Sequence, residues 1–138
     1  MAEKPSLFVR LSHQAELGTV ESHVVASREE ANQYRGSVQD SSSAQWDVVL
    51  VAGLGSTIMG SACVSIDHDK ATINTIFVVP EAREIGIGDA LLSQLIEELR
   101  HRAVTYVNAQ ALPGDRATKN LFERHGLIAQ TIIVGKEI

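Results

Sequence analysis

The sequence has little of what stabilises secreted chains or anchors a chain in a bilayer. It holds a single cysteine, Cys63, so no internal disulfide can form; we interpret this thiol as buried strand filler rather than a nucleophile. The longest apolar run, Val48 to Leu54, is far too short to cross a membrane, and Met1 to Pro5 lack the apolar core of a secretory signal. These absences predict a cytoplasmic protein with no membrane partner.

Clusters of basic residues are also missing. No run of Lys and Arg is longer than two residues, the net charge is −5, and the isoelectric point lies near 5.5. Nucleic acid binding needs a cationic surface, so this balance argues against a nucleic acid partner. An acidic field can favour a cationic amine substrate, although such a charge balance mostly serves solubility.

The composition that is present fits one soluble globular domain over residues 1–138, with 44% hydrophobic and 21% charged residues. Periodicity predicts an α/β (α+β) fold with a mixed sheet, and the polar, serine-rich segment 35–45 is expected to be a mobile loop. The expected strands are Leu7–Leu11, Asp47–Ala52, Thr57–Ile66, Ala71–Val79, Thr105–Ala111 and Ile128–Val134, and the expected helical segments are 13–34 with Ser12 as N-cap, Ile87–Arg102 and Asp115–His125.

The most informative segment joins a strand to a helix through two glycines. A Val-rich strand ends at Pro80, Gly86 and Gly88 follow, and apolar residues from Ile87 to Leu99 recur at helical spacing. The glycines therefore sit at a helix N-terminus, where free backbone N–H groups and the positive end of the helix dipole favour an anion. The alternative is a simple turn without a ligand.

Two common phosphate motifs do not fit this turn. A dinucleotide fingerprint needs a third Gly or Ala where Leu91 stands, and an acidic residue about 20 positions on, where the sequence reads Thr105 to Asn108. A P-loop needs Gly-Lys-Ser/Thr, and the pair Gly135-Lys136 is followed by Glu137. Neither of these two motifs therefore accounts for the turn.

The pattern Arg83-x-x-Gly86-x-Gly88 after a Val-x-Pro strand end resembles the acyl-CoA pyrophosphate loop of the GCN5-related N-acetyltransferase (GNAT) superfamily. The block Leu121-Phe-Glu-Arg-His-Gly-Leu127 looks like the last helix of that superfamily, and the order of elements from Ala71 to about Val134 matches it over about half the chain. The resemblance implies a GNAT-like acyl-CoA N-acyltransferase fold, a central mixed sheet flanked by helices.

The resemblance also implies a function. An acetyl group would pass from acetyl-CoA, the cosubstrate, to a primary amine of an unidentified acceptor by direct attack in a ternary complex, with no metal. The alternative is a non-catalytic acyl-CoA-binding or interaction module with a degenerate site. By the resemblance, the residues that bind the cofactor are Phe77, Val78 and Val79 along the pantetheine arm, Arg83, Glu84, Ile85, Gly86, Ile87, Gly88, Asp89 and Ala90 around the pyrophosphate, and Asp115, Asn120 and Phe122 in the last helix.

The loop departs from the family pattern in its charge. Glu84 stands where relatives commonly carry Gly or a basic residue, and Glu81 and Asp89 add two further acids. Like charge beside a pyrophosphate weakens binding, by less than about 1 kcal/mol for each exposed acid, and the backbone donors remain. We expect weakened affinity for the cofactor rather than its loss.

The positions of the acid and base depart as well. Phe122 replaces a tyrosine that often protonates the thiolate; His125 could act in its place through water, or could simply complement the helix dipole before Gly126. Asn74 replaces an acidic base and can hold a water that accepts the proton. Asp115 replaces an asparagine and is expected to be an N-cap.

The segment after Gly126 allows one strand but not the usual two-stranded hairpin. The expected strand Ile128–Val134 is apolar and would be an aggregation hazard if exposed. We therefore expect a homodimer that covers this edge.

Overall fold

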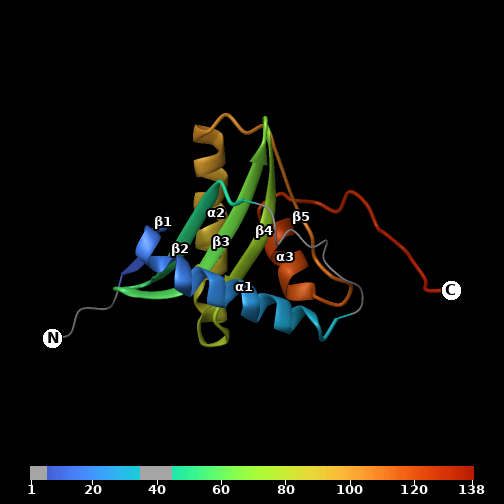
Figure 1. The fold of residues 1–138 in the computed structure, drawn as a ribbon, viewed down its shortest axis with the longest axis horizontal. Coiled ribbons are helices and arrows are strands. Elements are labelled where there is room, and N and C mark those ends of the chain that lie inside the picture. Colours follow the sequence, from blue (N-terminus) through green and yellow to red (C-terminus); the bar gives the residue numbers. More distant parts are fainter. Residues whose placement is uncertain (1–5, 35–44) are drawn as a thin grey trace.

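One five-stranded sheet organises the chain, in the order β1-β2-β3-β4-β5 (Figure 1). A computed structural model describes residues 6–34 and 45–138. The first four strands pair antiparallel with their sequence neighbours, and the fifth pairs parallel to the fourth, so the predicted mixed sheet is confirmed. The strands are β1 (Leu7–Leu11), β2 (Val48–Leu54), β3 (Thr57–Asp67), β4 (Lys70–Val78) and β5 (Tyr106–Ala109).

Helices cover both faces of this sheet. Helix α1 packs on one face, where Val20 and Val24 meet Val51 and Cys63, and α2 packs on the other face with α3 beside it (Figure 1). The helical segments are the 3-10 turn η1 (Gln14–Glu16), α1 (Leu17–Ala31), the 3-10 helix η2 (Pro80–Ile85), α2 (Ile87–His101) and α3 (Arg116–Arg124).

The larger core lies under α2. Its side chains Ile87, Leu91, Leu92 and Leu95 are fully buried, and they follow the i, i+4, i+5, i+8 spacing of one helical face. They pack against β2, β3 and β4. Helix α2 is thereby fixed on the sheet, and its N-terminus is held next to the end of β4.

The sheet opens at one point that matters for the site. The parallel pairing of β4 with β5 ends at the pair Ile73↔Ala109, and the register of β3 against β4 shifts at the next residue, Asn74, which has no opposite residue. This is a β-bulge, and a bulge bends and twists the strand that carries it. From residue 74 to 78, the edge of β4 away from β3 has no strand beside it in the described part of the chain.

Helix α1 begins later than the periodicity predicted. Ser12 is not its N-cap; the chain first forms η1, and the side chain of Glu16 accepts a hydrogen bond of 2.8 Å from the backbone N–H of His13. Arg10 binds the same carboxylate through both guanidinium nitrogens and lowers the pKa of Glu16 to about 2. Gly18 lies in the first turn of α1 and does not divide the helix.

Two other expectations end differently. The expected loop 35–45 lies outside the described residues apart from Gln45. The expected strand Ile128–Val134 is wrong: this segment has no regular secondary structure, and Ile132, Ile133 and Val134 are 85 to 87% exposed. It runs away from the sheet (Figure 1), so no strand supplies the ladder partner that a β-strand requires.

The two described stretches contain no helix with the length and the apolar composition that a bilayer crossing demands.

Leu91 gives a direct test of the core under α2. Because its side chain is fully buried, Leu91→Ala removes packed methyl groups and leaves a cavity, and we expect a loss of about 2–5 kcal/mol in the free energy of unfolding, measured by urea denaturation. The control Val25→Ala, at a residue 53% exposed on α1, should change stability by less than about 0.5 kcal/mol. Equal effects of the two substitutions would contradict this packing.

Candidate functional site

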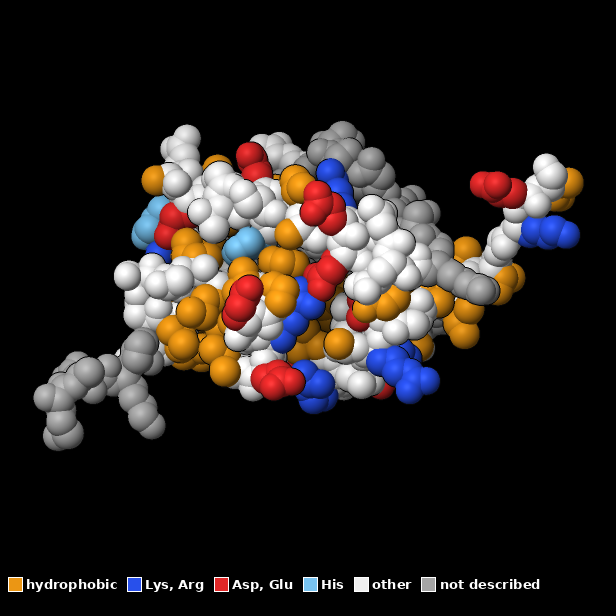
Figure 2. Space-filling view, turned by 90° about the horizontal axis from the view of Figure 1, so that it is seen from below, with side chains coloured by type: hydrophobic (Ala, Val, Ile, Leu, Met, Phe, Trp, Pro, Cys, Tyr) orange, Lys and Arg blue, Asp and Glu red, His pale blue; other side chains and the backbone are white. Residues whose placement is uncertain are grey.

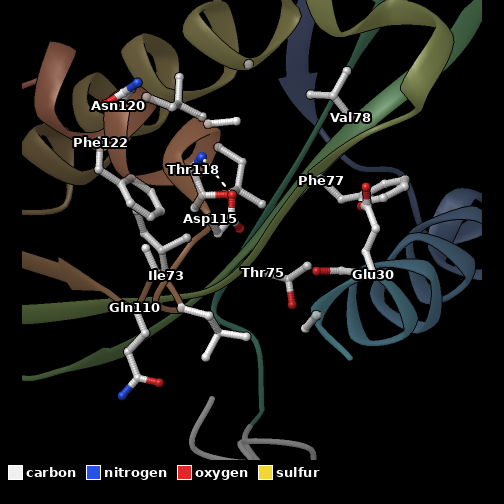
Figure 3. A pocket seen from close by; sticks show the side chains of 18 of the residues that line it. Glu30, Ile73, Thr75, Phe77, Val78, Gln110, Asp115, Thr118, Asn120 and Phe122 are labelled. Atoms are coloured by element: carbon white, nitrogen blue, oxygen red, sulfur yellow. Dashed lines mark hydrogen bonds between the residues drawn. The ribbon is translucent and has the colours of Figure 1, made fainter. Parts of the chain in front are cut away.

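A cavity of about 530 Å³ lies where β4 and β5 diverge. Its walls come from the end of α1, from β4, from the segment after β5 and from α3 (Figure 3). Figure 2 shows acidic and basic side chains next to one another around a hollow with apolar side chains deeper inside. Its volume falls in the range of small-molecule sites. The unpaired edge of β4 therefore faces a space that a ligand can fill.

The N-terminus of α2 borders this cavity. Gly86 ends η2 and caps α2 with φ 86°, a left-handed conformation that favours glycine, and no side chain caps the helix. The backbone amides ahead of Ala90 have no acceptor within the helix, and Gly88 lines the cavity. The turn therefore has the backbone geometry that the sequence analysis expected, a glycine turn at a helix start, and anion binding there stays a prediction.

An acidic residue in this first turn is neutralised by α3. The carboxylate of Asp89 accepts hydrogen bonds of 3.1 and 3.2 Å from Arg124, and it lies 2.8 Å from Nε2 of His125. Arg124 first, and His125 second, lower the pKa of Asp89 below its ordinary value. Arg124 also lines the cavity, so a cation accompanies the acid that the sequence analysis expected to weaken cofactor binding.

Arg83 turns toward α1. Its Nη1 and Nη2 donate to the two carboxylate oxygens of Glu30 at 2.5 and 2.6 Å, and its Nε donates to the carbonyl of Val78 at 2.9 Å. The guanidinium also lies 5.5 Å from the ring centre of Phe77, a cation–π distance. The carboxylate of Glu30 is the main cause that raises the pKa of Arg83.

The bulge residue Asn74 lines the cavity near its polar side. Its Oδ1 accepts a hydrogen bond of 2.8 Å from the hydroxyl of Ser65 on β3, which fixes the amide. Thr75 and Phe77 follow on β4 and border the cavity together with Glu30 of α1 (Figure 3). Glu30, Asn74 and Thr75 therefore bring a carboxylate, an amide and a hydroxyl to this part of the cavity.

Helix α3 forms the opposite wall. Asp115 is its N-cap, as predicted: its carboxylate accepts from the backbone N–H of Thr118 at 3.1 Å and from the hydroxyl of Thr118 at 2.7 Å. Phe122 is 6% exposed and belongs to the core cluster that includes Ile73, and Asn120 lines the cavity (Figure 3).

The predicted site residues divide into two groups. The cavity is lined by Asn74, Phe77, Val78, Arg83, Gly88, Asp89, Asp115, Asn120 and Phe122. The residues Val79, Glu84, Ile85, Gly86, Ile87, Ala90 and His125 do not line it. Most of the second group belong to the turn itself, where a ligand would meet backbone rather than side chains.

Sequence reasoning named no site residue in α1 or directly after it. Ser27 and Glu30 of α1 and Tyr34 beyond its end line the cavity, but no periodicity marks them, and the ion pair of Glu30 joins residues 53 positions apart. Arg124 lay inside the recognised block from Leu121 to Leu127, so its position three residues after Leu121 was a signal that could have found it.

The comparisons with known proteins agree with this geometry. The sequence profile of the acetyltransferase (GNAT) family matches residues 15–127. The chain belongs to this family. Comparison with curated proteins gave no significant sequence match.

Solved GNAT structures share the fold at low identity. The aminoglycoside N-acetyltransferase AAC(6')-Iy in complex with CoA has a TM-score of 0.76 and 12% identity, covering 100% of this chain and 98% of that one. An aminoglycoside acetyltransferase from an uncultured soil metagenomic sample, in complex with sisomicin, has a TM-score of 0.70 and 18% identity, covering 96% and 95%. The ribosomal-protein-S18-alanine N-acetyltransferase from Escherichia coli has 0.65 and 21%, covering 88% and 77%.

The reactivity of Cys63 tests the interpretation that this thiol is buried filler of a strand rather than a nucleophile. It is fully buried between α1 and the sheet, and burial raises its pKa to about 12, so very little thiolate exists at pH 8. We expect no reaction with Ellman's reagent in the folded protein and one equivalent of released thionitrobenzoate in guanidinium chloride. Rapid modification of the native protein would show that this thiol is accessible and would reopen a nucleophilic role.

Proposed function

We propose that this protein is an N-acetyltransferase that moves an acetyl group from acetyl-CoA to a primary amine. The observation that supports this best is one cavity bordered on one side by the unpaired edge of β4 and on the other by the uncapped N-terminus of α2. The first offers ladder groups to an extended amide-containing arm, and the second offers N–H donors to a pyrophosphate. Family membership agrees with that assignment.

The cofactor in this proposal is acetyl-CoA. Phe77 and Val78 lie at the unpaired end of β4, Val79 follows directly, and the three would meet the pantetheine arm through their backbone. The turn from Glu84 to Ala90 would hold the pyrophosphate by backbone donors. A structural neighbour was solved in complex with CoA, which is consistent with such a ligand in this fold.

Positioning carries most of the proposed chemistry. The neutral amine nitrogen attacks the thioester carbon and becomes positively charged. This nitrogen then loses a proton to water, the C–S bond breaks, and the CoA thiolate takes a proton from water. Asn74 is the residue we assign to hold the accepting water, because the bulge sets it at the point where β4 and β5 separate. We assign His125 a positioning role, through its contact with Asp89.

The acceptor is proposed only as a primary amine. Among the structural neighbours, one is in complex with sisomicin and another is named for an alanine of a ribosomal protein, so the fold is compatible with very different acceptors. We propose a cytoplasmic location, the compartment that supplies acetyl-CoA to such enzymes.

A non-catalytic acyl-CoA-binding module is the second candidate. It is favoured by Asn74 and Phe122, since neither side chain ionises to serve as base or acid. CoA binding measured by calorimetry, followed by thiol release across a panel of amines and peptides, separates the two candidates. Binding without turnover on every acceptor favours the module.

The variant Gly88→Glu tests the anion site. Gly88 is the second residue of α2, its added Cβ would meet Leu121 only at ordinary contact distance, and an acid in a first turn suits the helix dipole, so the protein should fold. The added carboxylate would repel a pyrophosphate from the free amides. We expect CoA affinity to fall by about tenfold or more in calorimetry, since each tenfold step needs only about 1.4 kcal/mol.

Gly18→Glu is the matched control. Gly18 is the second residue of α1 and is exposed, with no atom near its would-be Cβ. It introduces the same charge at the same helical position away from the cavity, and CoA affinity should stay within twofold of the wild type. An equal loss in both variants would point to net charge rather than to the turn.

We further propose a homodimer that covers the exposed apolar segment 128–134. Ile128, Ile132, Ile133 and Val134 are 66 to 87% exposed, and contiguous apolar surface of this kind favours association. In the described residues, β5 is paired only on its β4 side, so its other edge is open to a strand from a second copy.

Sedimentation equilibrium at micromolar concentration tests this association. We expect a dimer for the wild type and a monomer for the double variant Ile132→Asp and Ile133→Asp, because two buried charges would disfavour the contact. A wild type that sediments as a stable monomer would rule the homodimer out.

A further inference from the structure

One ion pair links the η2 side of the cavity to the α1 side. Arg83 comes from η2, the segment that leads directly into the N-terminus of α2, and Glu30 comes from the last turn of α1. Nη1 of Arg83 donates to Oε1 of Glu30 and Nη2 donates to Oε2, so the contact is bidentate. The two side chains are 40% and 37% exposed, so solutes can reach the pair.

This ion pair occupies the carboxylate of Glu30, the acid on the α1 side of the cavity among the described residues. The other two acids that line the cavity have structural roles: Asp115 caps α3, and Asp89 binds Arg124 and His125. Among the described residues that line the cavity, Glu30 is the acid on the side of Thr75 (Figure 3). As long as Arg83 binds it, the negative charge of this carboxylate is compensated, and its attraction for another cation is weakened.

We propose that Glu30 and Arg83 form an exchangeable pair, in which the phosphates of the acyl-CoA take over Arg83 and the released carboxylate of Glu30 binds the ammonium group of a cationic acceptor. The inference rests on the proposed function and names the acceptor class and a residue that selects it. A guanidinium pairs with phosphate in the same bidentate way as with carboxylate, so the exchange conserves the kind of contact that Arg83 makes.

The exchange makes the two ligands interdependent. Withdrawal of Arg83 leaves a carboxylate unpaired in the cavity, which opposes cofactor binding until a second cation arrives. An acceptor that brings this cation therefore binds better after the cofactor, and linkage requires that it also tightens cofactor binding by the same factor. A neutral acceptor gains nothing from the exchange.

Calorimetric titration with CoA at low salt tests the first part of the proposal, the transfer of Arg83 from Glu30 to the phosphates. In Glu30→Gln, Arg83 has lost its ion pair and keeps its contacts with Val78 and Phe77 and the attraction of Asp115. We therefore expect CoA to bind about threefold more tightly than to the wild type, the size of effect that a partly exposed ion pair produces. Glu29→Gln is the matched control, because Glu29 precedes Glu30 on α1, is exposed and does not line the cavity. It makes the same charge change and should leave CoA affinity within about 1.5-fold of the wild type, which is roughly the smallest effect measured for an exposed charge pair.

A double-variant cycle shows whether the effect passes through Arg83. Arg83→Gln should weaken CoA binding about tenfold, as expected for the loss of a charge-assisted phosphate contact. Adding Glu30→Gln to Arg83→Gln should then bring no gain, since the carboxylate has nothing left to release. An unchanged gain in the double variant would mean that Glu30 acts as a general charge, and would overturn the exchange.

Sisomicin, a polycationic amine, serves as the acceptor probe for the second half. With saturating CoA, we expect sisomicin to bind the wild type at least fivefold more tightly than without CoA, a coupling in the ordinary range of linked sites, and Glu30→Gln to abolish this difference. Equal binding with and without CoA, or no binding of sisomicin in either state, overturns the assignment of Glu30 to a cationic acceptor.

The outcomes also separate this inference from the proposed function. A wild type that binds no CoA overturns both. CoA binding that is unchanged or weaker in Glu30→Gln overturns the exchange alone and leaves the acetyltransferase proposal standing.

Discussion

The separation of β4 from β5 is the constraint on which the site depends. Two parallel strands that stayed paired along their whole length would leave no free ladder groups and no cavity. The pairing stops at Ile73, and the bulge at Asn74 bends β4 at the next residue. Helix α2, fixed on the sheet by its leucine face, then places its uncapped N-terminus beside the opening. Both halves of the proposed cofactor site thus follow from one interruption of one ladder.

Charge inside the opening is arranged as local pairs. Asp89 is balanced by Arg124, and Glu30 by Arg83, so the cavity stays nearly neutral although the chain carries a net charge of −5. Such pairs are partly exposed, and exposed pairs contribute little to stability. In the exchange that we propose for Glu30 and Arg83, such a weak pair can give up a partner to an incoming anion or cation. Of the three acids of the loop, Asp89 therefore opposes phosphate less than its charge alone implies.

Much of the fold was predictable, and the misses have physical reasons. The consecutive strands β2, β3 and β4 and the helices α2 and α3 carry clear periodicity and strong turn signals. The role of Asp115 as an N-cap follows from its position before a helix. The segment Ile128–Val134 has the composition of a strand, but a strand also needs a partner ladder, and composition holds no information about that. The start of α1 was misjudged because Arg10 and Glu16 form an ion pair that stabilises η1 ahead of it.

The sequence marks the proposed cofactor side of the cavity but not the proposed acceptor side, and the difference lies in how each is built. Backbone amides at a helix start need glycines at fixed spacing, and such a local requirement is visible in the sequence as Gly86 and Gly88. The acceptor side is made by side chains from α1 and β4 that meet only through the fold, as Glu30 meets Arg83. No spacing rule links residues that far apart. If the proposal for Glu30 holds, specificity for the acceptor is a property of tertiary contacts, and substitutions at the end of α1 change it without disturbing the turn between η2 and α2.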